Sequence, residues 1–104
     1  MRGDVFRLNA PRDTRGHERA GRRYAVVVQA DELALLSTWL VAPTSTSARP
    51  ATFRPEIEID GRRTKVLAEQ ASAVDPHRLG EQVGHLGFDE LRAVDAALRL
   101  VMSL

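Results

Sequence analysis

The amino-acid sequence predicts a mostly β domain of the α+β class, in which six to seven short strands form a small barrel and a C-terminal amphipathic helix packs against it. Short β-branched runs separated by turn residues indicate the strands. Apolar residues at intervals of three and four near the C-terminus indicate the helix. A length of 104 residues fits a single domain over residues 1–104.

The first half of the chain contains three candidate strands. The first is Asp4–Leu8, and the second is the run 24–28, which has apolar residues on both faces as a central buried strand requires. A helical turn at 31–36 precedes a third strand at 38–41, which we expect to end at Pro43. The segment 11–23 has dense charge and no apolar periodicity, so we expect a long loop, and such loops are usually functional.

The second half begins with the hydroxyl run 44–47, which we expect to lie in a loop. Alternating Glu and Ile at 56–59 indicate a half-exposed strand within 53–59, and Pro55 favours an edge position. The Asp60-Gly61 pair predicts a hairpin turn to a return strand at 62–67. Shorter strands are expected at 70–74 and 81–86, followed by the helix Phe88–Met102 with Gly87 at its N-cap.

The composition limits the chemistry that is available. Cysteine is absent, which excludes disulfides, thiolate metal sites and cysteine nucleophiles. The three histidines, His17, His77 and His85, lack the i, i+3 or i, i+4 spacing of metal ligands, so we expect neither a metal nor a cofactor. No apolar run approaches the ~20 residues of a membrane helix, and the N-terminus lacks a signal peptide's apolar stretch. We therefore expect a soluble cytoplasmic protein.

The charge is concentrated at the N-terminus. Residues 1–23 hold seven arginines and three acidic residues, whereas residues 24–104 hold eight basic and eleven acidic ones. A basic segment beside an acidic body indicates a polyanionic ligand. A genomic bias towards arginine explains the choice of arginine over lysine equally well.

Three clusters within this pattern are candidate sites. His17 and Glu18 lie among arginines, where an imidazole, a carboxylate and guanidinium groups can converge on one phosphodiester. Arg22 and Arg23 precede a buried strand that would hold them rigidly, as a phosphate clamp requires, although flanking charges also protect strands from aggregation. The hydroxyls at 44–47 are either donors to phosphate oxygens or an inert turn.

Four motifs together resemble, in order and spacing, the MazF/PemK family of toxin endoribonucleases. The first is Arg2-Gly3-Asp4-Val5-Phe6, similar to the family's Arg-Gly-Asp/Glu-Ile/Val-Trp start. The second is Gly16-His17-Glu18-Arg19-Ala20-Gly21-Arg22-Arg23 with the strand that follows. The third and fourth are Val41-Ala42-Pro43-Thr44-Ser45-Thr46 and Leu67-Ala68-Glu69-Gln70-Ala71-Ser72. The resemblance spans essentially the whole chain.

The resemblance implies an SH3-like barrel that forms a homodimer, cleaves single-stranded RNA without a metal, and is inhibited by an antitoxin with an acidic, partly disordered tail. It assigns catalytic roles to Arg23, Glu18 and Ser45, and to His17, which precedes the glutamate in part of the family. The general base stays open between Glu18, His17 and Glu69. The implied RNA-binding residues are Arg15, Arg19, Arg22, Tyr24, Thr44, Thr46, Glu69 and Gln70.

The sequence departs from the family pattern at several of these positions. Ser45 replaces a threonine and Glu69 an aspartate, while Tyr24 replaces a proline and offers a ring on which a base can stack. Leu67 stands where some members have a second catalytic arginine, so that role is unfilled.

A non-catalytic function is the alternative hypothesis to the nuclease. The gyrase-poisoning CcdB toxins share the barrel, and a simple RNA-binding module would need the same basic loop. The combination of Glu18, Arg23 and Ser45 favours catalysis, because binding alone has no use for an acid beside a phosphate.

Overall fold

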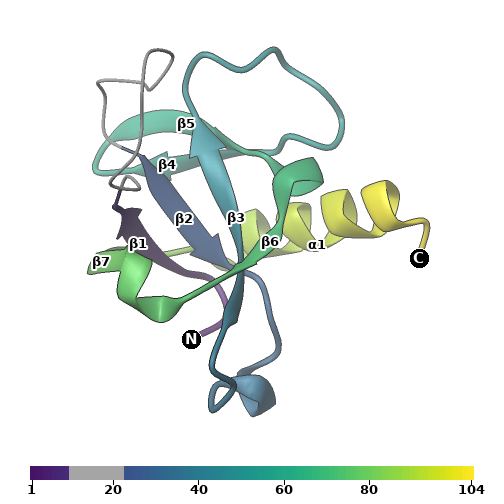
Figure 1. Ribbon diagram of the computed structural model, residues 1–104. Helices are drawn as coiled ribbons and strands as arrows, with labels where there is room; N and C mark the ends of the chain where they lie inside the picture. The colour runs from purple at the N-terminus through teal and green to yellow at the C-terminus, as the bar shows by residue number, and fades with distance from the viewer. Residues whose placement is uncertain (10–22) are drawn as a thin grey trace, which may run out of the picture.

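The computed structural model describes residues 1–9 and 23–104, and in these residues seven antiparallel strands form one curled sheet with a helix against one face (Figure 1). The strands are β1 (Asp4–Leu8), β2 (Tyr24–Val27), β3 (Trp39–Ser45), β4 (Glu56–Ile59), β5 (Arg62–Val66), β6 (Ser72–Val74) and β7 (Leu79–His85). The helix α1 spans Phe88–Met102, and the 3-10 turns are η1 (Asp31–Leu33), η2 (Ala68–Gln70) and η3 (Pro76–Arg78). The mostly β fold with a closing helix is confirmed.

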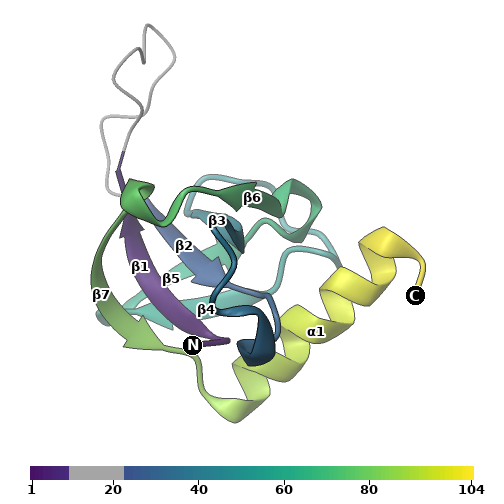
Figure 2. The same cartoon turned by 60° about the horizontal axis from the view of Figure 1, so that its bottom comes forward.

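Strand β3 is the centre of the sheet. The strand order is β4-β5-β3-β2-β1-β7, and β6 also pairs with β3. Along one side β3 pairs with β2, and along the other it pairs first with β6 over residues 39–41 and then with β5 over residues 44–45. The change of partner bends the sheet into a partly closed barrel, as Figure 2 shows.

Two apolar clusters fill the two sides of this sheet. The larger lies between the sheet and α1 and includes Val26, Val66 and Val94, which are all fully buried. The smaller contains Ala25 and Val27. Because side chains alternate along a strand, β2 contributes to both clusters, which confirms the expectation of a central buried strand.

The expected end of the third strand at Pro43 is wrong, and so is the assignment of Thr44 and Ser45 to a loop. Strand β3 continues through Pro43 to Ser45. Proline is normally excluded from central strands because it lacks the N–H that a sheet ladder uses. Here Pro43 lies between the stretches of β3 that pair with β6 and with β5, and its carbonyl accepts from the Leu67 N–H at 2.8 Å. The missing donor therefore breaks no ladder.

The other local expectations agree more closely with the structure. Strand β4 is an edge strand, and Asp60 and Gly61 form the hairpin turn with φ angles of 52° and 77°. The helix has the expected bounds, and at its N-cap the Gly87 N–H donates to Glu90. The strand expected at 70–74 is shorter, because η2 occupies residues 68–70.

The N-terminus is fixed by an acidic side chain at the start of β1. The Asp4 carboxylate accepts from His85 Nδ1 at 2.7 Å and pairs with the N-terminal amino group at 3.1 Å. Burial raises the pKa of Asp4, but the interactions with His85 and the N-terminal amino group lower it by more. The pKa of Asp4 therefore lies below its usual value. His85 therefore has a structural role, joining β7 to β1. No helix in residues 1–9 and 23–104 has the length and apolarity to cross a bilayer.

Candidate functional site

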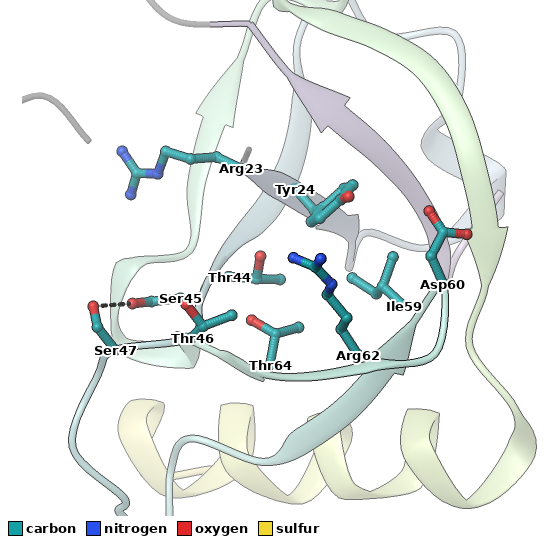
Figure 3. A pocket seen from close by; sticks show the side chains of 10 residues that line it. All are labelled: Arg23, Tyr24, Thr44, Ser45, Thr46, Ser47, Ile59, Asp60, Arg62 and Thr64. Carbon is teal, nitrogen blue, oxygen red and sulfur yellow. Dashed lines mark hydrogen bonds between the residues drawn. The ribbon is translucent and has the colours of Figure 1, made fainter. Parts of the chain in front are cut away.

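A cleft of about 770 Å³ opens where the ends of β2, β3 and β5 meet (Figure 3). Its lining combines hydroxyl groups, two arginines, one carboxylate and one aromatic ring. The lining residues are Arg23, Tyr24, Thr44, Ser45, Thr46, Ser47, Ile59, Asp60, Arg62 and Thr64. Five of the residues that the sequence assigned to the site (Arg23, Tyr24, Thr44, Ser45 and Thr46) are thus brought together.

The pairing of β2 with β3 explains this convergence. The antiparallel register sets Ala25 opposite Pro43. The next residues outward are Tyr24 and the preceding Arg23 at the start of β2, and Thr44 and Ser45 at the end of β3. All four therefore come to the same end of the strand pair, where they line the cleft.

Arg23 presents a donor that the described part of the chain leaves unused. Its Nε is buried and has no hydrogen-bond partner there. A buried polar group without a partner costs about 1 to 3 kcal/mol, so an acceptor supplied by a ligand would be bound strongly. In Figure 3 the guanidinium extends away from the Tyr24 ring.

The hydroxyl groups of the cleft differ in their surroundings. The Ser45 Oγ accepts from the Ala48 N–H at 3.1 Å and lies 3.4 Å from the Ser47 Oγ, so the turn after β3 fixes its position. Thr44 and Thr64 are buried side chains, with 3% and 5% exposure. All of them are short, neutral groups that can donate to a phosphate oxygen.

Four residues of the β4–β5 hairpin also line the cleft, and the sequence analysis did not assign them to the site. They are Ile59, Asp60, Arg62 and Thr64. The alternation of β5 contains the signal, because Thr64 and Val66 are buried while Arg63 and Lys65 occupy the other face. Arg62 shares the face of Thr64, so its position follows once β5 is known to border the cleft.

Glu69 and Gln70 do not line the cleft. They lie in η2, and the Glu69 carboxylate accepts from Arg54 Nη2 at 2.6 Å and from its Nε at 2.9 Å. Burial raises the pKa of Glu69, but the Arg54 hydrogen bonds lower it more, so the pKa lies below its usual value. A carboxylate in this ion pair is a weak base, which leaves Glu18 and His17 as the better candidates.

The remaining expected residues, Arg15, His17, Glu18, Arg19 and Arg22, lie outside the described residues. They precede Arg23 in the sequence, and Arg23 lines the cleft. Within the part that the structure describes, no three histidine or acidic side chains are grouped to hold a metal ion. The described cleft therefore offers cationic, hydroxyl and aromatic groups, which suit a phosphodiester and a base of single-stranded nucleic acid.

Comparisons with known proteins agree with this chemistry. A model of the family described as "PemK-like, MazF-like toxin of type II toxin-antitoxin system" matches residues 1–102. A candidate toxin from Mycobacterium tuberculosis is 39% identical over 105 residues, covering 100% of this chain and 98% of its own. Endoribonuclease EndoA of Bacillus subtilis is 30% identical, covering 99% of this chain and 94% of its own. A crystal structure of MazE-MazF from Deinococcus radiodurans is similar with a TM-score of 0.77 at 25% identity, covering 99% of this chain and 95% of that one.

Proposed function

The chain belongs to the PemK-like, MazF-like family of toxins of type II toxin-antitoxin systems, and from this premise we propose that it is a sequence-specific endoribonuclease that cuts single-stranded RNA in the cleft beside β2, β3 and β5. One observation carries the proposal. The pairing of β2 with β3 places Arg23 and Ser45, which are 22 positions apart in the sequence, in the lining of one cleft.

Cleavage proceeds by attack of the 2′-hydroxyl on the adjacent phosphorus. The reaction needs a base for the 2′-hydroxyl proton, stabilisation of the negative phosphorane, and a proton for the 5′-oxygen when its bond to phosphorus breaks. None of these steps requires a metal. The products are a 2′,3′-cyclic phosphate and a 5′-hydroxyl.

The residues of the chain divide these tasks. Arg23 stabilises the charge on the non-bridging oxygens, since a guanidinium with a pKa above about 12 is a poor proton donor but a good bidentate ligand of phosphate. The Ser45 hydroxyl donates to the same phosphate. Glu18 or His17, which precede Arg23 in the basic segment, takes the 2′-hydroxyl proton, and a solvent water gives a proton to the 5′-oxygen as its bond to phosphorus breaks.

A toxin with this activity acts in the cytoplasm, where it inhibits translation and growth by cutting cellular RNA.

We expect Arg23→Ala to lower the rate of RNA cleavage about 10² to 10³-fold, because the transition state loses a preorganised donor. The measurement is cleavage of a long RNA in excess EDTA, with analysis of the product ends. Arg63→Ala is the matched control, since Arg63 pairs with Glu56 at 3.0 Å and does not line the cleft. Complete loss of wild-type cleavage in EDTA, or 5′-phosphate ends, would contradict the mechanism. Equal effects of the two variants would show that Arg23 contributes only to the general positive charge of the protein.

The cationic cleft also suits the inhibitor that a type II toxin requires. We propose that an acidic, partly disordered antitoxin tail folds into it and competes with RNA for Arg23. The solved Deinococcus structure combines a related MazF with MazE, which supports a partner of this class. Charged side chains on both partners would steer their association.

In a competition titration, an acidic antitoxin peptide should displace labelled RNA, and its association should slow as salt rises because exposed charges are screened over ~10 Å at 0.1 M. An uncharged peptide in which Asp and Glu are replaced by Asn and Gln is the control. A bound acidic peptide that left RNA binding and cleavage intact would refute the shared site.

The surface also supports the expected homodimer, for which the edge strand expected at 53–59 is one candidate face. Part of that edge is already occupied, because the Glu58 N–H donates to Glu90 at 2.9 Å. Exposed Leu40, Met102 and Leu104 instead line a second groove of about 360 Å³ beside α1. Clustered exposed apolar side chains mark interaction surfaces, so we infer that a second copy covers this groove.

We expect light scattering of the wild type at micromolar concentration to give the mass of a dimer, and Met102→Glu to give a monomer, since a charged side chain would replace an apolar one in the covered groove. Phe88→Glu tests the other end of the same helix, where the side chain is also exposed, and should leave the dimer intact. A monomeric wild type would contradict the assignment.

A further inference from the structure

The Arg62 side chain lies on the side of β5 that faces the core, which is unusual for a charged residue. It shares the core-facing side of β5 with Thr64 and Val66, and it lies opposite Ile59 in the β4–β5 register. Inward charges of this kind can protect an exposed edge strand from aggregation. That explanation does not apply here, because β5 lies between β4 and β3.

Arg62 and the polar side chains around it have hydrogen-bond donors and acceptors that no described residue uses. In residues 1–9 and 23–104, the side chains of Arg62, Tyr24, Thr44 and Thr64 form no hydrogen bond or ion pair. The neighbouring Arg63, on the outer face of the same strand, is paired with Glu56. The Thr44 and Thr64 hydroxyls are not among the fully buried atoms that lack a partner, so they open onto the cleft, where a ligand can accept from them or donate to them.

The two ends of the cleft differ in character. In Figure 3, Arg23 and Ser47 lie at one end and Asp60 and Ile59 at the other, with the Arg62 guanidinium between them, pointing toward Tyr24 and Thr44. The carboxylate of Asp60 would repel a phosphate. The Asp60 end therefore suits a neutral group with flat apolar faces and a polar edge, and a nucleobase is such a group.

A donor from Arg62 and an acceptor from Asp60 separate the four RNA bases into two pairs when the sugar–phosphate attachment fixes which atom of the base faces each residue. Guanine and uracil carry a keto oxygen (O6 or O4) beside an N–H (N1 or N3), which matches an arginine donor and a carboxylate acceptor. Adenine and cytosine carry an amino group beside an unprotonated nitrogen at the same positions, which is the reverse pattern.

We propose that Arg62, Asp60 and the ring of Tyr24 form a nucleobase subsite that selects guanine or uracil next to the scissile phosphate. The inference rests on the proposed RNA cleavage and extends it to sequence recognition. It also gives a role to a second arginine in the cleft. Leu67, at the position where some family members have a second catalytic arginine, is buried in the core and cannot reach RNA.

The test compares cleavage by the wild type, Arg62→Ala, Asp60→Asn and the control Arg63→Ala. Asp60→Asn keeps the hairpin, because Asn-Gly is favoured in a turn with both φ angles positive. Cut sites are first mapped on a long RNA, and rates are then measured on oligonucleotides that differ only at the position next to the cut. Circular dichroism confirms that each variant is folded.

The wild type and Arg63→Ala should prefer guanine or uracil at one fixed position, and both Arg62→Ala and Asp60→Asn should lose about 10-fold of that preference. An unchanged preference in the two variants would overturn the subsite. An equal loss of rate on all four bases would also overturn it, because Arg62 would then bind the backbone. If the wild type cuts no RNA at all, the proposed function itself fails, which is a different outcome from cleavage with an unaltered preference.

Discussion

The change of pairing partner along β3, from β6 to β5, determines the curvature of the sheet and the position of the cleft. One strand cannot pair continuously with β6 and β5 on the same side, and Pro43, which has no N–H to donate, lies at the point where one pairing ends and the other begins. The bend at this point carries the last residues of β3 to the β4–β5 hairpin. Thr44 and Ser45 thereby meet β2 on one side and β5 on the other, and the cleft forms between them.

The alternation of side chains between the two faces of β2 and β5 determines which residues enter the core and which line the cleft. On β2 and β5 the core-facing positions are valines near the middle of the sheet, and they become Tyr24, Thr64 and Arg62 toward its open end. Groups with unused hydrogen-bonding capacity are thus held by the strands that contain the best-buried side chains of the fold. Such support gives the preorganisation that catalysis and base recognition require.

Local patterns in the sequence were sufficient for much of the fold. The bounds of β1 and α1, the Asp60-Gly61 turn and the edge position of β4 follow from periodicity and turn chemistry within a few residues. The end of β3 did not follow, because Pro43 is tolerated only through the tertiary arrangement of two partner strands. Arg62 was missed for a related reason, since only the sheet order places its face in the cleft. The roles of Glu18 and His17 stay predictions, as they lie outside the described residues.

Chemical-shift mapping of labelled protein can show whether RNA binds in the cleft beside β2, β3 and β5. The ligand is an oligonucleotide of the cleaved sequence with 2′-deoxyribose at the scissile position, which cannot supply the attacking hydroxyl. We expect the amides of Tyr24, Thr44, Ser45 and Thr64 to shift on binding while those of Met102 and Leu104 do not. Shifts confined to the groove beside α1, with the cleft amides unmoved, would contradict binding in the cleft.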